Sequence, residues 1–117
     1  MEKREIKFRA WEFDNNGGKL VYGYESYIGE ALQNGYHLMQ FTGLHDKNGK
    51  EIFEGDILNV DCLGVGGAFD DGVYKVEYII PDCAFALIQI DGKHGIPFNE
   101  CYEYEAIGNI YETNLIA

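Results

Sequence analysis

The residues with the greatest potential for chemistry gather in one acidic stretch, Phe41 to Leu58, which reads FTGLHDKNGKEIFEGDIL. Its Asp46, Asn48 and Glu51 could offer oxygen ligands to calcium. A calcium-binding EF-hand needs such ligands at alternate positions over about twelve residues, between two helices. Here lysines interrupt the series, and the loop is about half the required length. The spacing therefore argues for a turn rather than a calcium site.

Two turns account for the charges of this stretch. Asp46 to Gly49 fits a type I turn followed by a left-handed glycine, a common hairpin loop. Asp46 can accept a hydrogen bond from the backbone two residues on, and Asn48 tolerates the dihedrals that such loops need. Gly55 and Asp56 indicate a second bend. We assign a structural turn role to Asp46, Asn48, Gly49, Gly55 and Asp56.

Other reactive residue types lack the spacing that their chemistry requires. Zinc sites pair their ligands closely, as in CxxC or HxxxH, and no such pair occurs among the histidines and cysteines. Cys83 and Cys101 are predicted to be small buried residues beside strands. The glycines of GVGG, residues 64–67, are not followed by the lysine and helix of a phosphate-binding loop. We predict no catalytic residue, no metal and no cofactor.

The net charge of −11 over 117 residues limits the range of partners. Such a charge repels nucleic-acid phosphates and anionic membranes, so direct nucleic-acid binding is disfavoured. The opening residues MEKREIKFRAW lack the apolar core of a signal peptide, and no apolar run is long enough to cross a bilayer. We expect a cytoplasmic protein with reduced thiols and no membrane association.

Aromatic residues are abundant, at 15% of the chain. A small domain cannot bury all of them fully, and tyrosine and tryptophan are favoured in subunit interfaces. We expect most to pack in the core and the surplus to line an interface of a homo-oligomer. The candidates for that interface lie in the first third of the chain: Trp11, Phe13, Tyr22, Tyr24, Tyr27 and Tyr36.

The elements that must position these residues are mainly strands of one domain, residues 1–117. Alternation predicts a strand at Glu5–Phe13 that bends or is covered on both sides, and a hairpin partner at Lys19–Glu25. One short helix should follow, capped by Ser26 and ended by Gly35. After a strand at His37–Leu44, a small bent antiparallel sheet or SH3-like half-barrel should run from Ile52 to Tyr111. Gly108 indicates a bulge in its last strand.

Three segments carry a family resemblance: KFRAW at Lys7–Trp11, TGLHDKNGKEIFEGDI at Thr42–Ile57 and IGNIYE at Ile107–Glu112. In this order and spacing they resemble the YopX family of small proteins encoded by phages and prophages of Gram-positive bacteria. The resemblance implies a β-rich fold, self-association and a bacterial host cell. It implies no catalytic residues.

These observations favour a phage or prophage accessory protein that acts by protein–protein contact, on itself and on a host or phage protein. One alternative is an acidic decoy that occupies the nucleic-acid site of a host protein. The other is an enzyme whose acids and histidines gather in a cleft. A structure discriminates among these hypotheses by showing which aromatic and acidic side chains share a surface.

Overall fold

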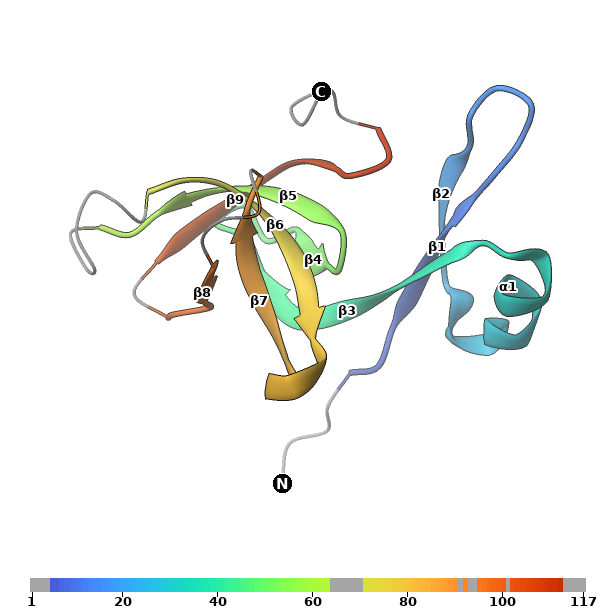
Figure 1. The fold of residues 1–117 in the computed structure, drawn as a ribbon, viewed down its shortest axis with the longest axis horizontal. Coiled ribbons are helices and arrows are strands. Elements are labelled where there is room, and N and C mark those ends of the chain that lie inside the picture. The colour runs from blue at the N-terminus through green and yellow to red at the C-terminus, as the bar shows by residue number, and fades with distance from the viewer. Residues whose placement is uncertain (1–4, 64–70, 91, 93–94, 101, 113–117) are drawn as a thin grey trace.

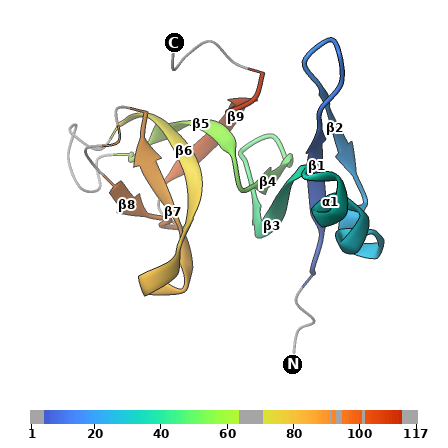
Figure 2. The same cartoon turned by 45° about the vertical axis from the view of Figure 1, so that its right-hand side comes forward.

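The computed structural model describes residues 5–63, 71–90, 92, 95–100 and 102–112 as two antiparallel sheets with one α-helix (Figure 1). The first sheet has the strand order β2-β1-β3-β4, and the second has the order β8-β7-β6-β5-β9. Figures 1 and 2 show the long strand β3 running from the side of the helix towards the second sheet. The two sheets thus share a boundary along β3 and β4.

The first sheet begins with a hairpin and is covered by the helix. Strands β1 (Phe8–Glu12) and β2 (Lys19–Tyr22) pair with each other, and β1 also pairs with β3 (His37–His45). A 3-10 turn, η1 (Tyr24–Ser26), leads into α1 (Ile28–Asn34). A small core of Ala10, Tyr24 and Ala31 packs beneath the helix. Strand β4 (Glu51–Phe53) completes the sheet by pairing with the end of β3.

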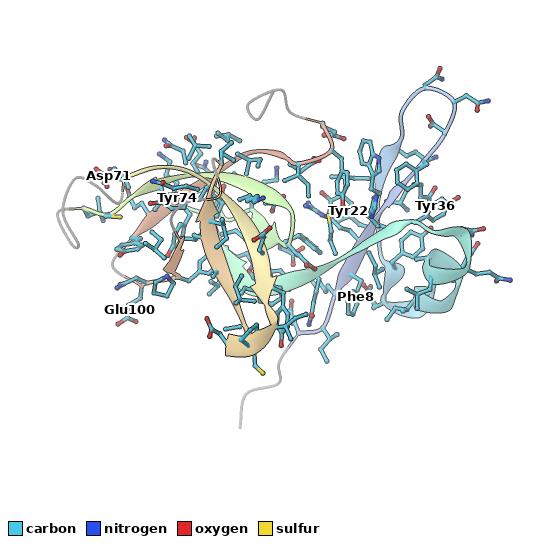
Figure 3. All side chains as sticks on the ribbon, in the orientation of Figure 1. Phe8, Tyr22, Tyr36, Asp71, Tyr74 and Glu100 are labelled. Atoms are coloured by element: carbon cyan, nitrogen blue, oxygen red, sulfur yellow. The ribbon has the colours of Figure 1, made fainter. Side chains whose placement is uncertain are left out.

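The second sheet carries the larger core. Its strands are β5 (Asp56–Asp61), β6 (Gly72–Ile79), β7 (Ala84–Gln89), β8 (Gly95–Pro97) and β9 (Glu103–Asn109). Alternate residues of β5 and β6, such as Leu58, Val60, Tyr74 and Val76, point into one apolar cluster. Figure 3 places Tyr74 within this sheet, away from Tyr36 beside the helix. The register of β5 and β9 shifts between Ala106 and Gly108, which is where the sequence predicts a bulge.

Within the described residues, the mainly β fold, the N-terminal hairpin and one short α-helix are as the sequence predicted. Gly35 ends the helix in a left-handed conformation, with φ of 72°, as predicted. No helix in the described ranges is long and apolar enough to cross a membrane.

Two local predictions are wrong. Ser26 does not cap α1: the 3-10 turn takes up Ser26, so the helix starts one residue later with Tyr27 at its N-cap and no side-chain cap. Cys83 is exposed rather than buried, because it sits in a left-handed turn (φ of 51°) after the 3-10 turn η3 (Ile80–Asp82), outside both strands. Cys101 and the glycine-rich segment 64–67 lie outside the described residues.

Candidate functional site: a cleft between the two sheets

A buried ion pair joins the two sheets. Arg9 of β1 and Asp56 of β5 are only 1% and 2% exposed. The Arg9 Nη2 group donates to Asp56 Oδ1 at 2.7 Å and to the Glu54 carbonyl at 3.3 Å. The other Asp56 oxygen accepts from the Phe53 amide at 2.8 Å. Burial raises the pKa of Asp56, and the Arg9 guanidinium opposes this rise by stabilising the carboxylate.

Aromatic rings enclose the arginine of this pair. The guanidinium carbon of Arg9 lies 4.7 Å from the ring centroid of Phe53 and 5.9 Å from that of Tyr22. The two rings meet edge to face at 5.6 Å. Arg9 Nε has no hydrogen-bond partner among the described residues, so the π-faces provide part of the compensation for its burial.

The Glu54–Gly55 turn brings a carboxylate to the boundary beside this pair. Gly55 has φ of +87°, donates its N–H to the Val76 carbonyl at 2.9 Å, and accepts from the Ile110 amide at 2.9 Å. The turn is therefore fixed to β6 on one side and to the segment after β9 on the other. Its position sets that of the Glu54 side chain.

Replacing Gly55 by alanine is expected to lower the free energy of unfolding by about 2 kcal/mol. The new Cβ would lie 2.9 Å from Met39 Sδ, and the backbone would keep an unfavourable positive φ. Urea denaturation followed by the fluorescence of Trp11 measures the loss. Gly49→Ala is the matched control, since its φ is +82° but its Cβ would meet nothing within 4 Å. Equal losses in both variants would contradict the role of the Met39 contact.

A cleft of about 390 Å³ opens above this turn. We call it the inter-sheet cleft. It lies between α1 and β3 on one side and β6 with the end of β9 on the other. Its lining residues are Leu32, Tyr36, His37, Leu38, Met39, Glu54, Gly55, Val76, Glu77, Ile110 and Tyr111. Two glutamates, one imidazole and two phenols therefore share a cleft whose walls are otherwise mainly apolar.

Glu54 is an acid of this cleft whose pKa is shifted by its surroundings. Burial raises its pKa, the nearby charge of Glu77 raises it further, and the Gln40 amide opposes the shift. That amide lies 3.5 Å from Glu54 Oε1, a long hydrogen bond. No lysine or arginine belongs to the described lining of the cleft. The half-buried carboxylate of Glu54 is thus poorly compensated by positive charge or hydrogen bonds from the protein itself.

A stack of rings forms one end of the inter-sheet cleft. Tyr111 stacks with both Trp11 and His37, with centroid distances of 5.4 and 5.0 Å and nearly parallel planes. Phe13 adds an edge-to-face contact with His37 at 4.9 Å. Burial raises the pKa of Tyr111, as does the negative charge of Glu54. Tyr111 is thus held by two stacking contacts at this end of the cleft.

A smaller pocket of about 260 Å³ lies beside the first sheet, where β1, β2 and the η1 turn meet the start of α1. We call it the tyrosine pocket. It is lined by Glu12, Val21, Tyr22, Gly23, Tyr24, Tyr27 and Glu30. The Tyr24 hydroxyl donates to the Glu12 carboxylate, and this bond raises the pKa of Tyr24 to about 12. Tyr22 and Tyr27 are 55% and 60% exposed.

Asp46 fastens the β3–β4 hairpin to the second sheet. Its Oδ1 accepts from the amides of Asn48 and Lys50, both at 2.9 Å, and its Oδ2 accepts from the Ala106 amide of β9 at 3.0 Å. The Lys47 amide donates to the Tyr104 carbonyl at 2.8 Å. Burial alone would raise the pKa of Asp46, but the three amides together lower it below its ordinary value.

The structure distributes the residues singled out from sequence over several places. Asp46, Asn48 and Gly49 form the hairpin turn that rests on β9, and Gly55 forms the bend beside the inter-sheet cleft. Asp56 follows that bend but lies in the buried ion pair. Of the six aromatic candidates, three line the tyrosine pocket, Trp11 and Phe13 join the ring stack, and Tyr36 lines the inter-sheet cleft. Trp11 and Tyr24 are buried within the chain.

Sequence reasoning missed Arg9, Glu54 and Tyr111 as members of a site. Alternation places Arg9 with Lys7 on an outward face of the first strand, yet Arg9, Ala10 and Trp11 are all buried because both faces of β1 are covered. The available signal was the bulky pair Trp11 and Phe13 next to Arg9, which indicated that both faces of the first strand are covered. No local signal joins Glu54 to Tyr111 across almost sixty residues.

Comparison with known proteins gives a family and a fold. A family model described as YopX protein matches residues 2–116. A crystal structure of protein EF1440 from Enterococcus faecalis is similar, with a TM-score of 0.51 and 24% sequence identity, covering 94% of this chain and 96% of that one. Among curated protein sequences, none matches. At this identity the crystal structure supports the fold alone.

Proposed function

The chain belongs to the YopX family, and from this premise we propose that it is a phage or prophage accessory protein that acts by protein–protein contact and self-associates. Its place of action is the cytoplasm of the bacterial host cell, and its further partner is a host or phage protein. The observation that carries the proposal is the tyrosine pocket, where two large aromatic side chains are more than half exposed.

The tyrosine pocket has the composition of a subunit interface. Tyrosine combines a large apolar ring with a hydroxyl group and loses little conformational entropy on binding, so it is enriched where proteins meet. Two copies related by a twofold axis would bring the same pocket face to face. Glu12 and Glu30 would then oppose their own copies across the interface. Since like charges repel and salt screens them, association should strengthen as the salt concentration rises.

Light scattering coupled to size-exclusion chromatography tests this proposal. We expect a dimer at tens of micromolar protein, and a larger dimer fraction at 0.5 M than at 0.05 M NaCl. Tyr27→Glu should give a monomer, since it puts a further charge into the pocket. Tyr78→Glu is the matched control, because Tyr78 is an exposed tyrosine on β6 of the other sheet and should leave the dimer intact.

Two results would contradict self-association through this surface. One is a wild-type protein that stays monomeric at both salt concentrations. The other is a Tyr27→Glu variant that keeps the wild-type mass. Far-UV circular dichroism of the variant verifies that it is folded.

An acidic decoy is the second candidate function, favoured by the net charge of −11 and by the two glutamates of the inter-sheet cleft. It requires a basic host protein whose binding is salt-sensitive and is displaced by DNA. Retention of that partner at 1 M NaCl would count against the decoy. An enzymatic alternative would use the same cleft, with the perturbed Glu54 as its acid.

A further inference from the structure

The inter-sheet cleft contains a poorly compensated negative charge, and its shape suits a long side chain. The Glu54 carboxylate is half-buried, and its hydrogen bond from the Gln40 amide is long, at 3.5 Å. Glu77 adds a second carboxylate at the rim. Lys75 pairs with Glu77 at 3.3 Å, but both side chains of that pair are partly exposed, so solvent weakens it.

The walls beside these carboxylates are apolar. Leu38 and Met39 line the cleft from β3, Val76 lines it from β6, and Ile110 lines it from the segment after β9. Such walls suit an aliphatic stem, whereas the carboxylates suit a cationic head at its tip. Arginine and lysine carry these two parts in one side chain. An anionic or purely apolar ligand would leave the Glu54 carboxylate desolvated and without a cation.

Arginine fits this arrangement better than lysine does. A guanidinium is less strongly hydrated than an ammonium group, and it presents several donors in one plane to carboxylate oxygens. A metal ion is a poorer fit, because the described residues contain no group of three histidine, cysteine or acidic side chains that could hold one.

We propose that the inter-sheet cleft binds an arginine side chain of a basic segment in a partner protein, with its guanidinium between Glu54 and Glu77. This inference rests on the proposed function as a protein-contact module and names the chemistry of its partner. The surface is separate from the tyrosine pocket, because the two have no lining residue in common. One copy of the chain can therefore use both surfaces.

Titration with a short peptide tests the inference directly. The probe is a glycine- and serine-flanked peptide with one central arginine, and its neutral isostere has citrulline at that position. Amide shifts of Glu54 and Gly55 in ¹⁵N NMR spectra, and the indole signal of Trp11 behind the ring stack, report on binding. We expect saturable shifts with the arginine peptide, weaker binding of a lysine peptide, and no saturable shift with citrulline.

Variants of the protein separate the cleft from the overall negative charge. Glu54→Gln keeps the size and the acceptor for the Gln40 amide, and it should weaken binding of the arginine peptide at least about fivefold. Glu103→Gln removes the same charge from an exposed position on β9 and should change the affinity by less than about twofold. The dispersion of the NMR spectrum verifies that each variant is folded.

The outcomes separate this inference from the proposed function. Equal weakening by Glu54→Gln and Glu103→Gln, or equal binding of the citrulline peptide, would overturn the assignment of the cleft. A wild-type protein that dimerises but does not bind the arginine peptide would overturn arginine binding in the cleft and leave self-association intact. A strictly monomeric protein that binds the arginine peptide would overturn self-association and leave the proposal of arginine binding in the cleft intact. Salt gives a further criterion, since it should weaken peptide binding while it strengthens the dimer.

Discussion

Replacing Arg9 by methionine is expected to lower the free energy of unfolding by about 3–5 kcal/mol, a large part of the stability of a small domain. Methionine keeps an apolar stem between the rings of Tyr22 and Phe53. It leaves the carboxylate of Asp56 buried without its cation, and that desolvated charge accounts for most of the cost. Urea denaturation at pH 7, followed by Trp11 fluorescence and by far-UV circular dichroism, measures the change.

A double-mutant cycle separates the ion pair from its surroundings. Asp56→Leu alone should cost a similar amount, because it orphans the guanidinium and the Phe53 amide. The variant that carries both substitutions should lose clearly less than the sum of the two, since neither charge is then left unpaired. Lys75→Met, which removes a partly exposed pair with Glu77, should cost less than about 1 kcal/mol. Additive losses at Arg9 and Asp56 would contradict a direct pair.

Replacing Asp46 by alanine is expected to lower the free energy of unfolding by about 3 kcal/mol, because three backbone amides lose a charged acceptor. The Ala106 amide belongs to the other sheet, so the loss of its hydrogen bond also loosens the hairpin from β9. Asp14→Ala is the matched control. Asp14 makes one comparable bond, to the Asn16 amide in an exposed turn, and its loss should cost less than about 1 kcal/mol.

The contribution of Asp46 should depend on pH. Its pKa is lower in the folded than in the unfolded chain, so folding favours the ionised form. The stabilisation is complete above the ordinary aspartate pKa of about 3.9 and is lost as the pH falls below it. The difference in stability between wild type and Asp46→Ala should therefore be constant from pH 7 to about pH 5 and shrink towards pH 3. A difference that grows on acidification would contradict this account.

Local signals in the sequence were sufficient for much of the fold. Gly35 predicts the end of the helix because only glycine adopts a left-handed conformation at little cost, and the DKNG turn follows from the same chemistry. The sequence also predicted the bulge at Gly108. Ser26 failed as a cap because it belongs to the 3-10 turn η1, which carries no clear sequence signature and precedes the helix.

The candidate site was less predictable because it depends on how the two sheets meet. Arg9 carries the same alternation signal as exposed Lys7, and only the approach of β5 makes it a buried partner of Asp56. Glu54 was visible as part of a turn, but its surroundings come from β3, β6 and the end of β9. Burial and charge pairing between distant segments are properties of packing, and no window of the sequence contains them.

The contact of the β3–β4 hairpin with β9 has a consequence for aggregation. A sheet edge offers unpaired amides and carbonyls, to which a strand of another molecule can add. Among the described strands, β9 has seven residues and would be the longest such edge. The hairpin occupies it at the Ala106 amide and the Tyr104 carbonyl. The remaining edges, β2, β4 and β8, have only four, three and three residues. By covering the β9 edge, the Asp46 turn opposes edge-to-edge polymerisation of the chain.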